Sequence, residues 1–357
     1  MFWLGAAVSL CYVPGLTGAY IATQWPLLSL LMPFALLRRG PYTAAHTAGL
    51  LFVVYAAVRA AYSPIPYFSV MGLWLVFITG LCMWFGTTLK DVRGLYAGLA
   101  IGGAVSSFIA VLQHFGFTGI PVVSNMPAGL YVNSVQQGTV LALIIVALAS
   151  ERMWFLTLPL LPGMWLAHSR GGWLALAVGL AACYVRRIWV FGIVAVAGAF
   201  YLLSPLGMTD ADRLFIWRSV WDNSTLFGWG PGVLYSILLS HAGVPFFPEY
   251  AHNDALQLVF EYGIGAAIPI GIIGYALYRS DIKEWPVVVA FVTAGCYSMP
   301  LFMPVTAFLA FVAVGRILRS DGVVVSYSGN RGQYGVSWAR ALRSQAFSLG
   351  SHHTAKG

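Results

Sequence analysis

Three arginines and one histidine interrupt a strongly apolar sequence, and their types suit chemistry on an anionic substrate. Arg170 follows Ser169 in "LAHSRGGWLALAVG", and Arg213 and Arg218 lie in "TDADRLFIWRSVWDNSTLFGWGPG". His252 lies in "FFPEYAHNDALQLVFEYGIGAAIPIG". A guanidinium keeps its positive charge and can bind two phosphate oxygens at once. A histidine titrates near neutral pH, as a general base should. These residues predict a phosphorylated ligand with proton transfer beside it.

The residues after His252 predict where a helix starts. Asn253 or Asp254 can cap a helix, which would put His252 at a helix N-terminus, where backbone N–H groups attract anions. Glu261 lies nine residues further on, about 13 Å along such a helix. A carboxylate at that depth in a membrane is costly, so we expect it to have a polar role.

A second polar stretch, "SNMPAGLYVNSVQQGTVLAL", puts amide side chains at the start of another predicted helix. Asn133, Gln136 and Gln137 could bind sugar hydroxyls, or they could only cap the helix. Their spacing favours neither interpretation, and both stay open.

Simpler interpretations exist for the charged residues. Arg170 could bond lipid phosphate at the end of a membrane helix, and Arg218 could pair with Asp222 four residues on. A stripe of Leu214, Trp217 and Trp221 predicts an amphipathic helix at the level of the lipid headgroups.

Metal and covalent chemistry find little support in the sequence. Glu249, His252 and Asp254 lack a second His or Cys at ligand spacing, and Ser169 lacks the strand-turn-helix context of a hydrolase nucleophile. No P-loop or GxGxxG stretch is present. We therefore expect no metal and no cofactor.

Composition predicts that the chain is an all-α membrane helix bundle. Of its 357 residues, 59% are hydrophobic and only 8% are charged, and mean hydropathy is +0.80. A soluble domain carries about 25% charged residues. The net charge of +8 could suggest nucleic acid, but its distribution along the chain argues against that partner. The four cysteines lie in apolar runs without paired spacing and are predicted to be core residues.

A membrane helix needs about 20 apolar residues. On this basis the sequence predicts about twelve spans: 2–14, 18–37, 42–61, 67–87, 92–115, 135–150, 153–168, 172–185, 188–205, 254–278, 286–300 and 304–318. Residues 1–319 form this bundle, with a long loop at about 206–252. Residues 320–357, rich in Ser, Gly and Arg, are predicted to be a flexible tail.

The basic residues predict the orientation of the bundle. If the spans alternate, fifteen of the nineteen Lys and Arg residues fall on one side, together with both termini. That side should be cytoplasmic. Only Arg59, Arg170, Arg213 and Arg218 are left for the outer side, where the long loop also lies. The chemistry is therefore expected on the outer face.

Four stretches together resemble the O-antigen ligase superfamily. Three are "HSRGGWLALAVGL", "DRLFIWRSVWDNSTLFGWGPGVL" and "HNDALQLVFEYGIG", and the fourth is "AGLYVNSVQQGTVLAL"; the likeness covers about residues 127–275. Gly172 stands where Ala or Ser is commoner in the family, and Ser134 replaces the usual Pro.

The resemblance implies a polytopic enzyme of the bacterial inner membrane with its site on the periplasmic side. Its donor would be a glycan on undecaprenyl diphosphate, transferred with inversion and without metal. By motif, Arg170 and Arg213 would hold the diphosphate, and His252 would activate the acceptor hydroxyl. Arg218, Asn133, Gln137, Ser169, Asn253, Asp254 and Glu261 are further candidate substrate-binding residues.

Three acceptors fit such an enzyme. Lipid A-core would make it an O-antigen ligase, a growing polysaccharide a Wzy-type polymerase, and a protein hydroxyl a protein O-oligosaccharyltransferase. Outside the enzyme class, the alternative is a transporter, whose site should lie near the bilayer midplane.

Overall fold

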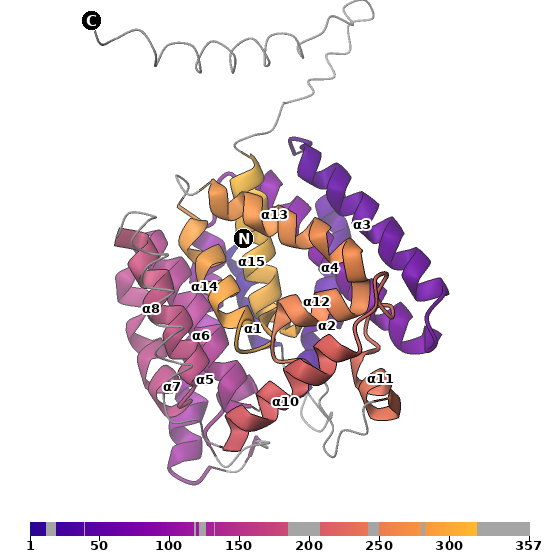
Figure 1. Cartoon of the computed structure of the whole chain (residues 1–357). Helices are drawn as coiled ribbons and strands as arrows, with labels where there is room; N and C mark the ends of the chain where they lie inside the picture. The colour runs from indigo at the N-terminus through magenta and orange to yellow at the C-terminus, as the bar shows by residue number, and fades with distance from the viewer. Residues whose placement is uncertain are drawn as a thin grey trace, which may run out of the picture. The chain divides into compact units, whose positions relative to one another are not determined.

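The described part of the chain is built from helices joined by loops (Figure 1). The computed structural model describes residues 1–11, 19–38, 40–117, 119–120, 126–131, 133–184, 208–241, 250–279 and 283–319. The predicted all-α fold is confirmed there. The predicted tail at 320–357, the predicted span 188–205 and residues 206–207 and 242–249 of the predicted loop 206–252 lie outside these ranges.

The described part of the chain contains a series of α-helices. In chain order they are α1 Phe2–Leu10, α2 Ala19–Leu31, α3 Ala44–Ala61, α4 Pro66–Thr88, α5 Arg93–His114, α6 Ser134–Ser150, α7 Leu161–Leu166, α8 Arg170–Tyr184, α10 Met208–Asp222, α11 Leu234–His241, α12 Asp254–Tyr262, α13 Ala267–Tyr278, α14 Trp285–Gly295 and α15 Pro304–Arg319. Short 3₁₀ turns extend several of them, as at Met32–Leu37 after α2 and Gly263–Ala266 between α12 and α13.

Four helical stretches in the described residues are long and apolar enough to cross a membrane: Ala44–Ala61, Pro66–Thr88, Arg93–His114 and Asp254–Tyr278. Each agrees with a predicted span to within two residues. Their length and composition make the chain a membrane protein.

The predicted total of twelve spans is wrong for the described residues. The predicted span 153–168 is two 3₁₀ turns followed by the six-residue helix α7, and 286–300 contains the eleven-residue α14. Pro159 and Pro162 lack the N–H that a continuous helix needs, and their rings clash with the preceding turn. Apolar composition alone therefore overestimated the number of full-length spans.

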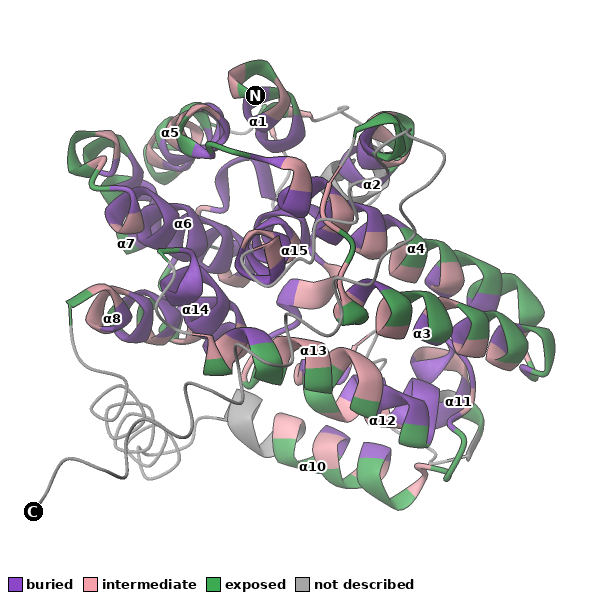
Figure 2. Ribbon diagram, turned by 90° about the horizontal axis from the view of Figure 1, so that it is seen from above, coloured by how far each residue is buried: buried purple, intermediate pink, exposed green. Residues whose placement is uncertain are grey.

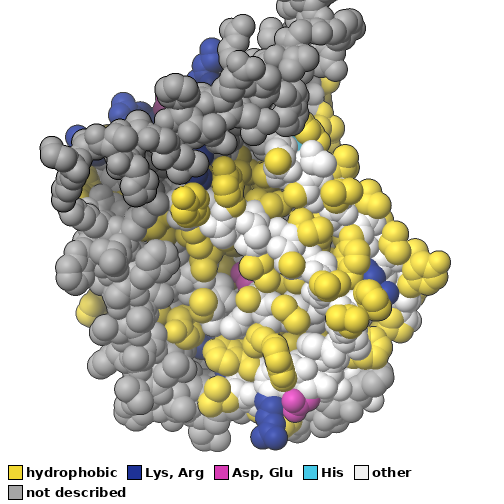
Figure 3. Space-filling view, turned by 45° about the horizontal axis from the view of Figure 1, so that its top comes forward, with side chains coloured by type: hydrophobic (Ala, Val, Ile, Leu, Met, Phe, Trp, Pro, Cys, Tyr) yellow, Lys and Arg dark blue, Asp and Glu magenta, His cyan; other side chains and the backbone are white. Residues whose placement is uncertain are grey.

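The core of the bundle lies around α6 and α15, as the burial view shows (Figure 2). Nearly every residue of α6 is buried, whereas α3 keeps much of its surface exposed (Figure 2). Large apolar side chains are exposed on several helices, including Leu50, Tyr67, Phe108 and Trp165. Apolar side chains also cover much of the face in Figure 3. A surface of this kind suits contact with lipid.

Small residues bring α6 and α8 close together. A Cβ atom on Gly172 would lie only 2.7 Å from the backbone carbon of Gly138, and one on Gly138 would lie 2.4 Å from the Ser169 Cβ. Membrane helices approach closely where such side chains are small. This contact is a physical reason for Gly172, where a larger residue was expected from the family resemblance.

Basic side chains and their partners gather at one end of the bundle. Glu151 pairs with Arg93 at 3.2 Å and with Lys283 at 3.7 Å, and Arg316 pairs with Glu284 at 2.8 Å. The end of α6, the starts of α5 and α14 and the end of α15 therefore meet at this end. The grouping agrees with the alternation predicted from the sequence.

Candidate active site

Helix α10, which carries Arg213, packs on α12, which follows His252. Ile216 and Val220 of α10 share a buried apolar cluster with Phe260 of α12. The predicted stripe does not form this contact, because Leu214 and Trp221 are exposed. Trp217 instead donates its indole N–H to the Ala251 carbonyl at 2.9 Å.

His252 has an unusual backbone conformation and a lowered side-chain pKa. Its φ is +51°, in the left-handed region that side chains other than glycine rarely adopt. Burial and the nearby positive charge of Arg213 lower the pKa of His252 from 6.5 to about 4. The imidazole is therefore neutral at pH 7 in the substrate-free protein and can accept a proton, but its pKa is lower than the near-neutral value that the sequence predicted for a general base.

Asn253 and Asp254 have different environments. Asn253 is the N-cap of α12, because its Oδ1 accepts from the Leu256 N–H at 3.0 Å, and its amide also donates to the Cys296 carbonyl at 3.3 Å. Asp254 is buried and accepts from the Leu301 N–H at 3.0 Å. The open choice of cap is thus decided in favour of Asn253.

Ser169 and Arg170 begin α8. Ser169 is buried, and its Oγ accepts from the Gly172 N–H at 3.1 Å, as an N-cap side chain does. Its role in substrate binding stays a prediction. Arg170 is the first residue of the helix and is exposed. A Cβ atom on Gly171 would lie 3.8 Å from that of Tyr297.

Cys296 and Tyr297, which follow α14, lie next to the starts of both α8 and α12. Tyr297 lies beside the start of α8, and the Cys296 carbonyl accepts from the cap of α12. The segments that carry Arg170 and His252 therefore face the same short connection after α14, although they are far apart in the sequence.

The remaining predicted residues have structural partners. Asn133 caps α6 by accepting from the Val135 N–H at 2.9 Å, and Gln137 is fully buried and accepts from the Ser106 hydroxyl at 2.6 Å. Arg218 pairs with Asp222 at 3.6 Å, with both side chains largely exposed. The simpler interpretations offered by the sequence describe the contacts of Asn133 and Arg218, whereas Gln137 bonds α5 instead of capping α6.

Arg59, the fourth arginine that the sequence assigns to the outer side, binds the loop after α10. Its guanidinium donates to the Gly228 carbonyl, and Tyr55 on the same helix donates to the Phe227 carbonyl at 3.0 Å and the Tyr262 carbonyl at 2.9 Å. The loop that contains "GWGPG" is thus fixed to α3 and to the end of α12.

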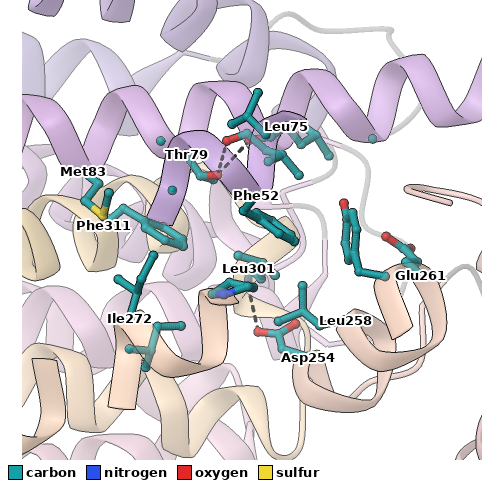
Figure 4. Close-up of a pocket in the computed structure, with 18 of the residues that line it drawn as sticks. Phe52, Leu75, Thr79, Met83, Asp254, Leu258, Glu261, Ile272, Leu301 and Phe311 are labelled. Atoms are coloured by element: carbon teal, nitrogen blue, oxygen red, sulfur yellow. Dashed lines mark hydrogen bonds between the residues drawn. The ribbon is translucent and has the colours of Figure 1, made fainter. Parts of the chain in front are cut away.

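Asp254 and Glu261 line a cavity of about 110 Å³ among apolar side chains (Figure 4). Glu261 and Gln257 also line a larger cavity of about 720 Å³, between α2, α4 and the start of α11. Both residues are buried, and the Gln257 amide donates to Glu261 Oε1 at 2.9 Å. The sequence singled out Glu261 but not Gln257.

Two further features were not predicted. His168 also has a left-handed backbone, with φ of +47°, two residues before Arg170. Gln257 contacts the peptide before His252 through its Oε1 atom, which accepts from the Ala251 N–H at 3.1 Å. The spacing of Gln257 to Glu261, one helical turn on the same face, was the available signal.

Within the described residues, no group of three or more His, Cys, Asp or Glu side chains could hold a metal ion. The expectation of metal-independent chemistry stays a prediction. No family model matches the chain, and no curated protein matches it.

Proposed function

We propose that this chain is a membrane glycosyltransferase that moves a glycan from undecaprenyl diphosphate to an acceptor hydroxyl on the periplasmic face. The observation that carries the proposal is the packing of α10, which bears Arg213, against α12, which follows His252; Trp217 of α10 also bonds the Ala251 carbonyl next to His252. This packing brings the Arg213 charge close enough to add to the effect of burial in lowering the pKa of His252 to about 4. A fixed cation beside a neutral base suits a reaction in which an anion leaves while a hydroxyl loses its proton.

The proposed step is a single inverting displacement. The acceptor oxygen attacks the anomeric carbon of the donor sugar, and the bond from that carbon to the diphosphate oxygen breaks. His252 takes the hydroxyl proton, and the electron pair leaves with undecaprenyl diphosphate. Arg213 and Arg170 stabilise the charge on the leaving group, which carries up to three negative charges.

Among acceptors, we propose lipid A-core, which makes the enzyme an O-antigen ligase. The alternative of a Wzy-type polymerase uses the same donor chemistry and a growing polysaccharide. The four motif stretches support the superfamily rather than either member.

A transporter fits less well. Its ions and substrate should bind near the bilayer midplane on broken helices. Here Arg170 and His252 lie at helix starts, and Arg213 lies within α10. The helix break at Gly263 and the buried Glu261 do lie further along α12 and its continuation.

Glycan profiling of a deletion strain tests the acceptor. Loss of all glycan-capped lipid A-core, with uncapped core remaining, supports the ligase. A single repeat unit left on the core supports the polymerase, and unchanged glycans together with impaired export of a solute support the transporter. Complementation with wild type and with His252→Ala shows whether the phenotype depends on the site.

A further inference from the structure

A chain of hydrogen bonds runs from α12 to the peptide that precedes His252. We propose that Gln257 and Glu261 are positioning residues that hold His252 in its left-handed backbone conformation. The inference rests on the proposed function, in which His252 is the base, but it concerns residues to which that function assigns no part in the chemistry.

The turn that carries His252 is held from two helices. The N–H of Ala251 donates to Gln257 Oε1 of α12 at 3.1 Å, and its carbonyl accepts from Trp217 of α10 at 2.9 Å. Ala251 is fully buried, so water does not compete for either bond. Asn253 then caps α12 on the other side of His252. A strained φ persists only where the surroundings fix it in this way.

Glu261 determines which way the Gln257 amide points. Its carboxylate accepts from Gln257 Nε2 at 2.9 Å and from the Gly232 N–H. Both partners are donors in the structure. With the amide nitrogen of Gln257 bonded to Glu261, the amide oxygen faces the Ala251 N–H.

The same residue also fixes the loop that follows α10. The Glu261 carbonyl accepts from the Gly230 N–H at 2.9 Å, and the Phe260 carbonyl accepts from the Trp229 N–H at 3.1 Å. Glu261 thus joins the loop after the arginine-bearing helix to the turn that carries the base. A change here should disturb the placement of His252 without removing a group that takes part in the proposed displacement.

Charged and titratable groups surround His252 on several elements. Arg213 on α10 acts on His252 directly. Asp254 and Glu261 lie further along α12, and Cys296 follows α14, where its carbonyl accepts from Asn253. The test therefore moves the carboxylate of Glu261 to position 257 and leaves Arg213, Asp254 and Cys296 unchanged.

Variants that exchange the side chains of Gln257 and Glu261 distinguish a role in positioning His252 from a role in the stability of the fold. Glu261→Gln permits either orientation of the paired amides, and Gln257→Glu sets two carboxylates against each other. In the double variant Q257E/E261Q, the carboxylate now at position 257 can accept from the Ala251 N–H and from the amide now at position 261. The oxygen of that amide can accept from the Gly232 N–H.

Every donor therefore keeps an acceptor in the double variant, but the charge moves one helical turn closer to His252. Thr293→Val is the control, because it removes a buried hydrogen bond to the Val289 carbonyl on α14, away from this chain of hydrogen bonds.

We expect Glu261→Gln to lower kcat about 10- to 100-fold with the donor KM within about twofold, because a small misplacement of a reacting group is costly. The double variant should recover kcat to within about threefold, with the acid limb of its pH profile raised. Histidine NMR of the full chain in lipid nanodiscs, assigned with His252→Gln, should give a midpoint near 4 for wild type. Glu261→Gln should raise that midpoint towards 6.5, and Thr293→Val should leave it unchanged.

The proposal is overturned if folded Glu261→Gln protein keeps both the wild-type kcat and the wild-type midpoint. It is also overturned if the double variant is no better than Glu261→Gln. If His252→Ala transfers glycan normally, the proposed base is wrong. A raised midpoint in Glu261→Gln would then still support the positioning of His252.

Discussion

Arg213 and Arg218 lie five residues apart on one helix in different environments. Arg213 is close enough to His252 to lower its pKa, whereas Arg218 forms an exposed pair with Asp222. Exposed pairs of this spacing contribute about 0.3–0.5 kcal/mol. We expect Arg218→Ala to keep transfer within about threefold of wild type, measured as glycan-capped product at equal protein in the membrane. A loss as large as that of Arg213→Ala would contradict this assignment.

Arg213 also sets the protonation of His252. Removing its positive charge by Arg213→Ala should raise the pKa of His252 above 4, although burial keeps it below 6.5. Histidine NMR of the substrate-free protein measures this without any assay of transfer. An unchanged midpoint would mean that the two side chains do not interact.

The lowered pKa has a defined consequence for stability. Because the unfolded chain binds the proton first as the pH falls below 6.5, the contribution of neutral His252 is complete above 6.5 and is lost between 6.5 and about 4. We expect wild type to lose thermal stability over that range more steeply than His252→Gln, measured by tryptophan fluorescence. Parallel curves for the two proteins would contradict it.

At the scale of elements, the contact between α6 and α8 positions the start of α8 and therefore Arg170. Gly172→Ala places a methyl group 2.7 Å from the Gly138 backbone, so the helices must separate. We expect a loss of about 1–3 kcal/mol of stability. Gly271→Ala is the matched control, because a Cβ there meets nothing within 4 Å, and it should be neutral or slightly stabilising. Equal thermal shifts in the two variants would refute the close contact.

Helix starts could be predicted from the sequence, but tertiary partners could not. Asn253 is recognisable as a cap because a short polar side chain precedes an apolar run. Ser169 caps in the same way, but it was assigned to substrate because the cap and the ligand use the same oxygen. The bond from Gln257 to Ala251 and the left-handed turn at His252 depend on how α10 packs on α12, and no local spacing encodes that packing.

At the scale of the whole molecule, hydropathy located the apolar segments but overestimated how many are full spans. Pro159 and Pro162 interrupt the apolar segment 153–168, and α14 ends at Gly295, before the predicted end of its segment. The proposed orientation rests on the basic residues, of which Arg93, Lys283 and Arg316 pair with carboxylates at one end of the bundle. A reporter active only in the cytoplasm should therefore work after Arg319 and be silent near Gly232. Activity at Gly232 would contradict the proposed location of the site.

Transfer by purified protein in lipid nanodiscs tests the central claim most directly. A labelled glycan on undecaprenyl diphosphate and lipid A-core are mixed with wild type, His252→Ala, Arg213→Ala or Arg213→Lys, with excess chelator present. We predict that wild type forms capped lipid A-core despite the chelator and that His252→Ala loses about 10²–10⁴-fold in turnover. Arg213→Ala should be inactive, and Arg213→Lys should recover poorly because a lysine lacks the paired donors. Normal turnover by His252→Ala, or activity that needs an added divalent ion, would contradict the account.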